Sequence, residues 1–224
     1  MSPAIATGAH RYAVCYAPNP GSLGWLAGSH WLGRCAALLR PLQQLAIDGV
    51  TAEDLHHLTA APRRLGWHAP ISAPFALAPG ADWIALHQAV QRLAHSLAPC
   101  ALPPLHVARL ERSGVGLALV PAPTHPANAL LRDAAAACAA QLEPLAAPRG
   151  DAAGTAFAPD GFRFHMPITG PLDPVDAATQ ALVLDAAQEY FADLPTLQFN
   201  SLALFSEPTP GADFVLLDHL EMAA

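Results

Sequence analysis

The sequence predicts a two-lobed protein of mixed strands and helices with pseudo-two-fold symmetry. Three observations lead to this prediction. The chain has 224 residues, of which 53% are hydrophobic, so it can form one large or two small fused globular units. The order strand–helix–strand–strand occurs twice along the chain. The two blocks also match without a gap, because adding 97 to His68 gives His165 and the neighbouring residues follow.

The individual elements follow from hydrophobic periodicity and from the turn-forming residues between them. Strands are predicted at 11–17, 65–73, 104–111, 114–121, 161–169, 197–206 and 213–220. Helices are predicted at 22–32, 51–59, 81–97, 126–143 and 174–192. Segment 146–160 contains small residues with Gly and Pro, which favours a linker.

The internal repeat has one specific pattern, aromatic-His-x-Pro-Ile-(Ser/Thr)-x-Pro, which is written twice. The matched pairs include His68 with His165, Pro70 with Pro167, Ile71 with Ile168, Pro74 with Pro171, and Gly114 with Gly211. Two prolines, a histidine and a turn glycine at one ungapped offset indicate a true repeat. We therefore expect one bilobal domain over 1–224, with lobe 1 at about 11–121 and lobe 2 at about 126–220.

Composition excludes several classes of function. The net charge is −7, and all 11 positive residues are Arg, which argues against non-specific nucleic-acid binding. No apolar run is long enough for a membrane span, and no signal peptide is visible, so we expect a cytoplasmic protein. The oligomeric state stays open. The four cysteines are scattered and are expected to be small buried side chains without a disulfide or metal role: Cys15, Cys35, Cys100 and Cys138.

The repeated histidines are the main candidates for chemistry. In a strand, residues i, i+2 and i+4 share a face, so His68 lies on the side of Ser72 and His165 on the side of Thr169. If the two-fold axis brings both strands to one cleft, it holds two imidazoles and two hydroxyls. Such a pair suits acid–base catalysis near neutral pH. The alternative is that each His is a structural residue and each hydroxyl an ordinary strand hydroxyl.

Three further residues are candidates for contact with an anionic substrate. Arg163 stands two residues before His165 and shares its face, whereas its counterpart is Gly66, so the cleft would be cationic on one side only. Arg64 precedes the first motif and either recruits an anion or is solvated. Tyr12 either lines the cleft or belongs to a half-buried core. No cofactor or metal is expected, because no Gly-rich phosphate loop and no metal-spaced His/Cys cluster occurs.

At these residues the sequence resembles a known family. The phrases RYAVCYAP, APRRLGWHAPISAPF and FRFHMPITGPL are similar to the two-histidine (2H) phosphoesterase superfamily, in the branch of proteins encoded beside phosphonate-metabolism (carbon–phosphorus lyase) genes. The resemblance runs from about residue 11 to residue 220. It implies a bilobal α+β fold with two antiparallel sheets and outer helices around a central cleft. It also implies metal-independent hydrolysis or transfer at cyclic phosphates and other phosphodiesters.

The chain departs from the family pattern in two places. The family motif is His-x-(Thr/Ser), whose hydroxyl binds phosphate oxygens, but here Pro70 and Pro167 occupy both positions. A hydrogen bond to a charged group contributes about 1.5–3 kcal/mol, so the loss of both hydroxyls would weaken the binding of a phosphate substrate considerably. The segment 146–160 is also shorter than the basic and aromatic stretch that relatives have before the second motif.

We therefore expect a phosphodiesterase or cyclic-phosphate hydrolase in which His68 and His165 are the acid–base pair, without assigning which is the acid. The substrate is expected to be small and anionic. The expected substrate-binding residues are Arg163, Ser72, Thr169, Tyr12 and Arg64. Two alternatives stay open: a non-catalytic binding or accessory protein with the same cleft, and a histidine-pair enzyme that acts on a non-phosphate substrate.

Overall fold

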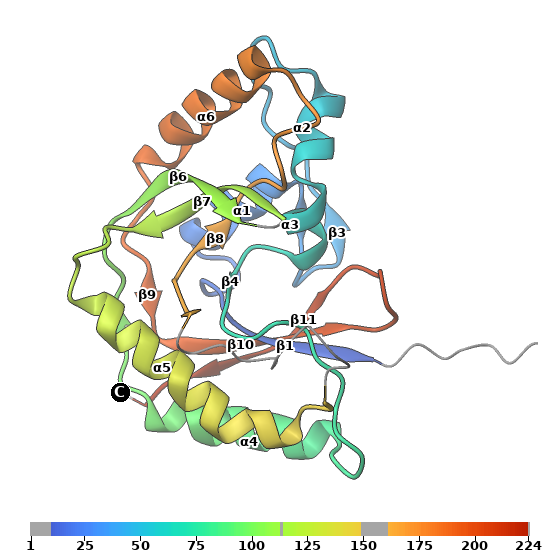
Figure 1. The fold of residues 1–224 in the computed structure, drawn as a ribbon, viewed down its shortest axis with the longest axis vertical. Coiled ribbons are helices and arrows are strands. Elements are labelled where there is room, and N and C mark those ends of the chain that lie inside the picture. The colour runs from blue at the N-terminus through green and yellow to red at the C-terminus, as the bar shows by residue number, and fades with distance from the viewer. Residues whose placement is uncertain (1–9, 113, 149–160, 224) are drawn as a thin grey trace, which may run out of the picture.

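The computed structural model of the chain describes residues 10–112, 114–148 and 161–223. Most of the predicted linker 146–160, and Ser113 at the predicted hairpin turn, therefore lie outside the described residues. Within these limits the chain forms antiparallel sheets with helices around them, which confirms the predicted α+β class (Figure 1).

Two sheets form the framework (Figure 1). A four-stranded sheet has the order β11-β10-β1-β4, and a three-stranded sheet has the order β6-β7-β8. All of their pairings are antiparallel. The strands are β1 (Arg11–Tyr16), β4 (Ala69–Pro70), β6 (Leu105–Arg112), β7 (Val115–Pro121), β8 (Met166–Pro167), β10 (Ser201–Glu207) and β11 (Val215–Glu221). Two short pairs complete the set: β2 (Arg34–Cys35) with β3 (Arg40–Pro41), and β5 (Cys100–Ala101) with β9 (Gln198–Phe199).

Six α-helices are seen among the described residues: α1 (Leu23–Leu32), α2 (Ala52–Leu58), α3 (Ala60–Leu65), α4 (Trp83–Ser96), α5 (Ala127–Leu142) and α6 (Ala177–Ala192). A short 3₁₀ turn, η1 (Glu143–Leu145), follows α5. Helix α4 packs against β10, β11 and α5, whereas α6 packs against β6. Figure 1 shows α4 and α5 below the four-stranded sheet and α6 at the opposite end of the molecule. Helices α4, α5 and α6 thus lie on the outside of the two sheets, whereas α1 and α3 are drawn near the middle of the molecule (Figure 1). No described helix is both long and apolar enough to cross a membrane.

The two sheets are built from strands of both sequence repeats. The offset of 97 matches the hairpin β6–β7 with the hairpin β10–β11, and Gly114 and Gly211 have φ of 86° and 89° at the two turns. The same offset matches β4 with β8. In space, however, β8 pairs with β7, whereas β4 pairs with β1 and not with β11, which lies at the other edge of its sheet. The sheets therefore cross the boundary expected between 11–121 and 126–220.

The histidine strands are much shorter than the predicted ranges 65–73 and 161–169. Only two residues of each pair with a neighbour, and the second of each is proline, which has no N–H to donate. Both strands lie at a sheet edge, which is where proline is tolerated. Helix α3 was not predicted. Its proline, Pro62, lies in the first turn, where no intrahelical N–H bond is needed.

Close packing at the β7–β8 pair gives a first prediction. A Cβ at Gly116 would lie 2.3 Å from the carbonyl oxygen of Gly170 and 2.8 Å from Thr169 Oγ1. We expect Gly116→Ala to lower the free energy of unfolding by about 1–3 kcal/mol in urea denaturation, because backbone must move. Gly161→Ala is the control, since nothing lies within 4 Å of its Cβ position. An equal effect of both variants would contradict the close-contact explanation.

Candidate active site

The two histidine strands lie next to each other at the centre of the molecule. Residues of β4 and β8 approach within 8 Å between Cα atoms, although they belong to different sheets (Figure 1). The charge of His165 lowers the pKa of His68, so the two imidazoles lie within electrostatic reach of each other. The structure thus brings together the two residues that the repeat predicts as a pair.

Strand pairing shows which face of each sheet carries the histidines. Pro70 pairs with Cys15, and Pro167 pairs with Ala118. Because side chains alternate along a strand, the histidine two residues before each proline shares the face of Cys15 or Ala118. Consistent with this, the ring of His68 lies 5.5 Å from the ring of Phe205, which packs with Cys15.

Both imidazole rings are held in the same way. His68 Nδ1 lies 2.8 Å from the carbonyl oxygen of Gly66, and His165 Nδ1 lies 2.8 Å from that of Arg163. A carbonyl oxygen only accepts, so in each ring Nδ1–H is the donor, and Nε2 is the unprotonated nitrogen of the neutral ring. The two bonds each join Nδ1 of the histidine to the carbonyl oxygen two residues earlier in the sequence. They fix the tautomer and the orientation of both rings.

The two histidines differ in exposure. His68 is 6% exposed, whereas His165 is partly exposed. Burial is the main cause that lowers the pKa of His68 to about 4; the hydrogen bond with Gly66 opposes this effect, and the charge of His165 adds to it. His68 is therefore neutral at physiological pH and can accept a proton.

Ser72 and Thr169, which we expected to bind substrate, have a different role. Val14 N–H donates to Ser72 Oγ at 2.9 Å, and Leu117 N–H donates to Thr169 Oγ1 at 2.8 Å. Both residues are buried, at 3% and 0% exposure. The alternation argument assumed that each strand stays regular past its proline. Beyond the prolines, however, the amides of Ile71 and Ser72 both donate to the carbonyl of Val14, and those of Ile168 and Thr169 both donate to that of Leu117, so the regular alternation is broken there. The hydroxyls of Ser72 and Thr169 hold the chain after β4 and β8 against the neighbouring strands.

Tyr12 lies on the wrong face for the expected role. It shares a hydrophobic core with Val14 and with residues of α4, on the side of the sheet opposite the Cys15 face. Its ring stacks with His10 at 4.8 Å and with Trp83 at 5.8 Å between centroids. The core alternative for Tyr12 is therefore the one that the structure supports.

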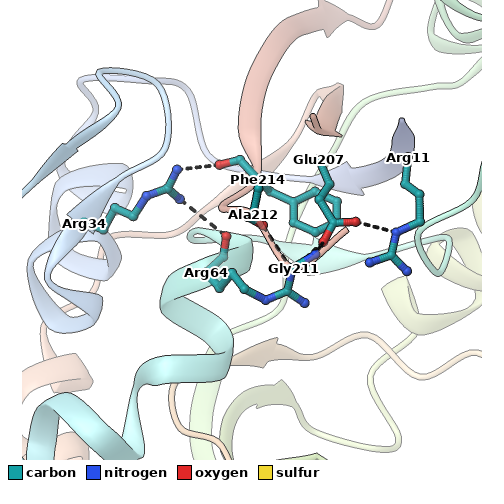
Figure 2. A network of polar contacts seen from close by, with 7 residues as sticks. All are labelled: Arg11, Arg34, Arg64, Glu207, Gly211, Ala212 and Phe214. Carbon is teal, nitrogen blue, oxygen red and sulfur yellow. Dashed lines mark hydrogen bonds and ion pairs between the residues drawn. The ribbon is translucent and has the colours of Figure 1, made fainter. Parts of the chain in front are cut away.

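Arg64 is engaged in a buried ion-pair network (Figure 2). The carboxylate of Glu207 is fully buried, and it accepts from Arg64 Nη1 at 2.7 Å, from Gly211 N–H at 2.8 Å and from Arg11. Burial raises the pKa of Glu207, but these hydrogen bonds outweigh burial and hold the pKa below its usual value. Arg64 also donates to the carbonyl of Ala212. Through Nη1 it thus holds the chain before His68 in place.

Arg163, a predicted binding residue, lies beside a cavity. A pocket of about 690 Å³ is lined by His165 and Arg163, and also by Asn128 and Arg132 of α5. His68 is not among its lining residues. The sequence analysis missed Arg132, although Asn128 and Arg132 stand four residues apart in an Ala-rich helix, a spacing that puts them on one face.

The described part of the chain contains no candidate metal site. No group of three or more His, Cys, Asp or Glu side chains in those residues is placed to hold a metal ion. The four cysteines are free thiols; Cys100 is partly exposed and the other three are buried.

Comparisons with known proteins show to which family the chain belongs. A family model described as "Protein of unknown function (DUF1045)" matches residues 70–155 and 151–215. Among curated proteins, a ribose 1,5-bisphosphate phosphokinase PhnN from Laribacter hongkongensis is 34% identical over 227 residues, covering 92% of this chain and 50% of that protein. A protein with the same name from Janthinobacterium sp. is 31% identical over 230 residues, covering 92% and 49%. The chain thus spans about half the length of the curated relatives it matches.

Several solved structures are distantly similar to this chain. Kluyveromyces marxianus Usb1 aligns with a TM-score of 0.36 and 12% sequence identity, covering 94% of this chain and 99% of that chain.

The burial of His68 gives a second prediction. Because its pKa is lowered in the folded state, the unfolded chain binds the proton more readily. The pKa difference therefore stabilises the folded state fully above about pH 6.5. This contribution, about 3 kcal/mol to the free energy of unfolding, is lost as pH falls toward about 4. We expect His68→Gln to remove this part of the pH dependence, measured by urea denaturation from pH 7.5 to 4. His106→Gln, an exposed strand histidine, should keep the wild-type slope. A His68→Gln profile parallel to wild type would contradict the prediction.

Proposed function

The chain belongs to the DUF1045 family of proteins of unknown function, and from its site we propose that it is a metal-independent phosphodiesterase of the 2H type that opens a small phosphodiester or cyclic phosphate. The proposal rests on one observation: equivalent hydrogen bonds hold the two histidine rings. Each ring donates from Nδ1 to a carbonyl two residues upstream, on adjacent strands. Two imidazoles with defined tautomers, within electrostatic reach of each other, suit paired acid–base catalysis.

The unequal burial of the histidines suggests their roles. His68, neutral at pH 7, takes the proton of the attacking water at Nε2 as the water oxygen bonds to phosphorus. His165, the more exposed ring, gives a proton from Nε2 to the leaving oxygen as the phosphorus–oxygen bond breaks. The products are a phosphomonoester and a free hydroxyl. A bound phosphate anion favours the protonated form of both rings, which strengthens His68 as a base.

The names of two relatives bear on the substrate. Two proteins that match this chain over about half their length are named ribose 1,5-bisphosphate phosphokinase PhnN. This name favours a ribose phosphate as the substrate class, and it agrees with the place in phosphonate metabolism that the family resemblance implies.

A non-catalytic binding or accessory protein is the second candidate. It is favoured by Pro70 and Pro167, which stand where the family places phosphate-binding hydroxyls. The burial of Ser72 and Thr169, at 3% and 0% exposure, disfavours their hydroxyls as a replacement.

The proposal predicts loss of turnover on removal of either histidine. Wild-type protein, treated with EDTA, should hydrolyse adenosine 2′,3′-cyclic phosphate or bis(p-nitrophenyl) phosphate. His68→Ala and His165→Ala should each lower kcat at least about a hundredfold, because each removes one proton-transfer step. His106→Ala should not change kcat. Unchanged turnover in either cleft variant would refute the histidine-pair mechanism.

A double variant separates the two candidates. If wild type is inactive but Pro70→Thr/Pro167→Thr hydrolyses these substrates, the native chain is a binding protein with a recoverable 2H site. If neither hydrolyses them, acid–base chemistry on a non-phosphate substrate is the remaining reading.

A further inference from the structure

The pocket beside His165 is a basic site in an acidic chain. The protein carries 18 acidic and 11 basic residues, yet two of the arginines line this one pocket, and none of its described lining residues is acidic. Arg163 comes from the segment before β8, and Arg132 comes from α5, so two separate elements converge on it. A cavity of about 690 Å³ is of the size that holds a small organic ligand.

The two guanidinium groups have hydrogen-bonding capacity to spare. Arg163 Nη1 donates to the carbonyl of Phe162 at 2.9 Å, which leaves its other donors for a ligand. Arg132 is exposed, and within the described ranges it has no hydrogen-bond or ion-pair partner. A guanidinium presents its donors as a planar fork that matches the oxygens of a phosphate or carboxylate.

The other side chains of the pocket limit what it can hold. Asn128 uses both donors of its amide nitrogen on the carbonyls of Ala122 and Pro123, so it contributes no free N–H. The remaining wall is largely apolar and includes Phe162, Phe164 and Leu131. The pocket therefore suits an organic ligand with an anionic end rather than a fully hydrated ion.

The position of His165 links this pocket to the histidine pair. His165 lines the pocket and also lies within electrostatic reach of His68, which does not line it. A ligand whose reacting group lies between the two rings would thus extend past His165 toward Arg132.

We propose that this pocket binds a second, non-reacting anionic group of the substrate, a phosphomonoester, which is held by Arg132 and Arg163. This inference rests on the proposed function and narrows it: the substrate is a phosphorylated cyclic phosphate rather than a simple cyclic diester. Arg132 is a binding residue that selects for this second charge.

The first test measures binding without catalysis. Ribose 5-phosphate and ribose are titrated into wild type, Arg132→Met and Arg92→Met by calorimetry. Arg92 is an exposed helix arginine away from the pocket and serves as the matched control. Wild type and Arg92→Met should bind ribose 5-phosphate, ribose should bind far more weakly, and Arg132→Met should weaken the phosphate-dependent binding at least about tenfold. Equal affinity of Arg132→Met and wild type for ribose 5-phosphate would overturn the inference, as would the absence of binding to wild type.

The second test compares two substrates that differ only in the second phosphate. For adenosine 2′,3′-cyclic phosphate carrying a 5′-phosphate, Arg132→Met should raise KM at least about tenfold with little change in kcat. For the same compound without the 5′-phosphate, KM should not change. If histidine-dependent hydrolysis is seen but KM for both substrates is unaffected, the proposed function stands and the second anion site fails. If Arg132-dependent binding is seen without hydrolysis, the anion site stands and the proposed function fails.

Discussion

Two buried hydrogen bonds from backbone amides to side-chain hydroxyls hold the histidine strands in place. The regular ladder of each of these strands covers only two residues, and the second of them is proline, which has no N–H. Beyond the prolines, the Val14 N–H donates to Ser72 Oγ and the Leu117 N–H donates to Thr169 Oγ1. A buried amide without a partner would cost about 1–3 kcal/mol, so these hydroxyls add to the backbone hydrogen bonds that Ser72 and Thr169 themselves donate to Val14 and Leu117. Together these bonds fix the chain on the C-terminal side of both histidines.

The exchange of strands between the repeats makes the site depend on the whole chain. His68 lies beside β1, which pairs with β10 near the C-terminal end of the sequence. The network of Figure 2 joins the same distant segments, because Glu207 of β10 binds Arg11 of β1 and Arg64 of α3. Removing one partner of a buried ion pair is costly, since it leaves a charge without compensation. The segment that leads into His68 is thus fixed by residues from both ends of the chain.

The sequence predicted the parts of the site that depend on local pattern and missed those that depend on distant partners. The repeated motif correctly indicated that His68 and His165 come together, and strand alternation placed Arg163 on the side of His165. Alternation failed at Ser72 and Thr169 because the register is irregular just after the prolines, where two successive amides donate to one carbonyl of the neighbouring strand. The partner of Arg64 lies 143 residues away in the chain, so no local pattern could show that its charge is used. Arg132 could have been found from its spacing to Asn128.

The asymmetry of the cleft has a packing cause. The residue equivalent to Arg163 is Gly66, whose φ of 87° lies in the left-handed region, and a Cβ there would lie 2.8 Å from the Cβ of Ala36. No arginine can take this position without moving the backbone. The two-fold repeat therefore gives two similar histidines, while packing allows a cation beside only one of them. A substrate with two unlike ends would experience these two sides as different, and this difference would let a symmetric pair of imidazoles act on one bond in one direction.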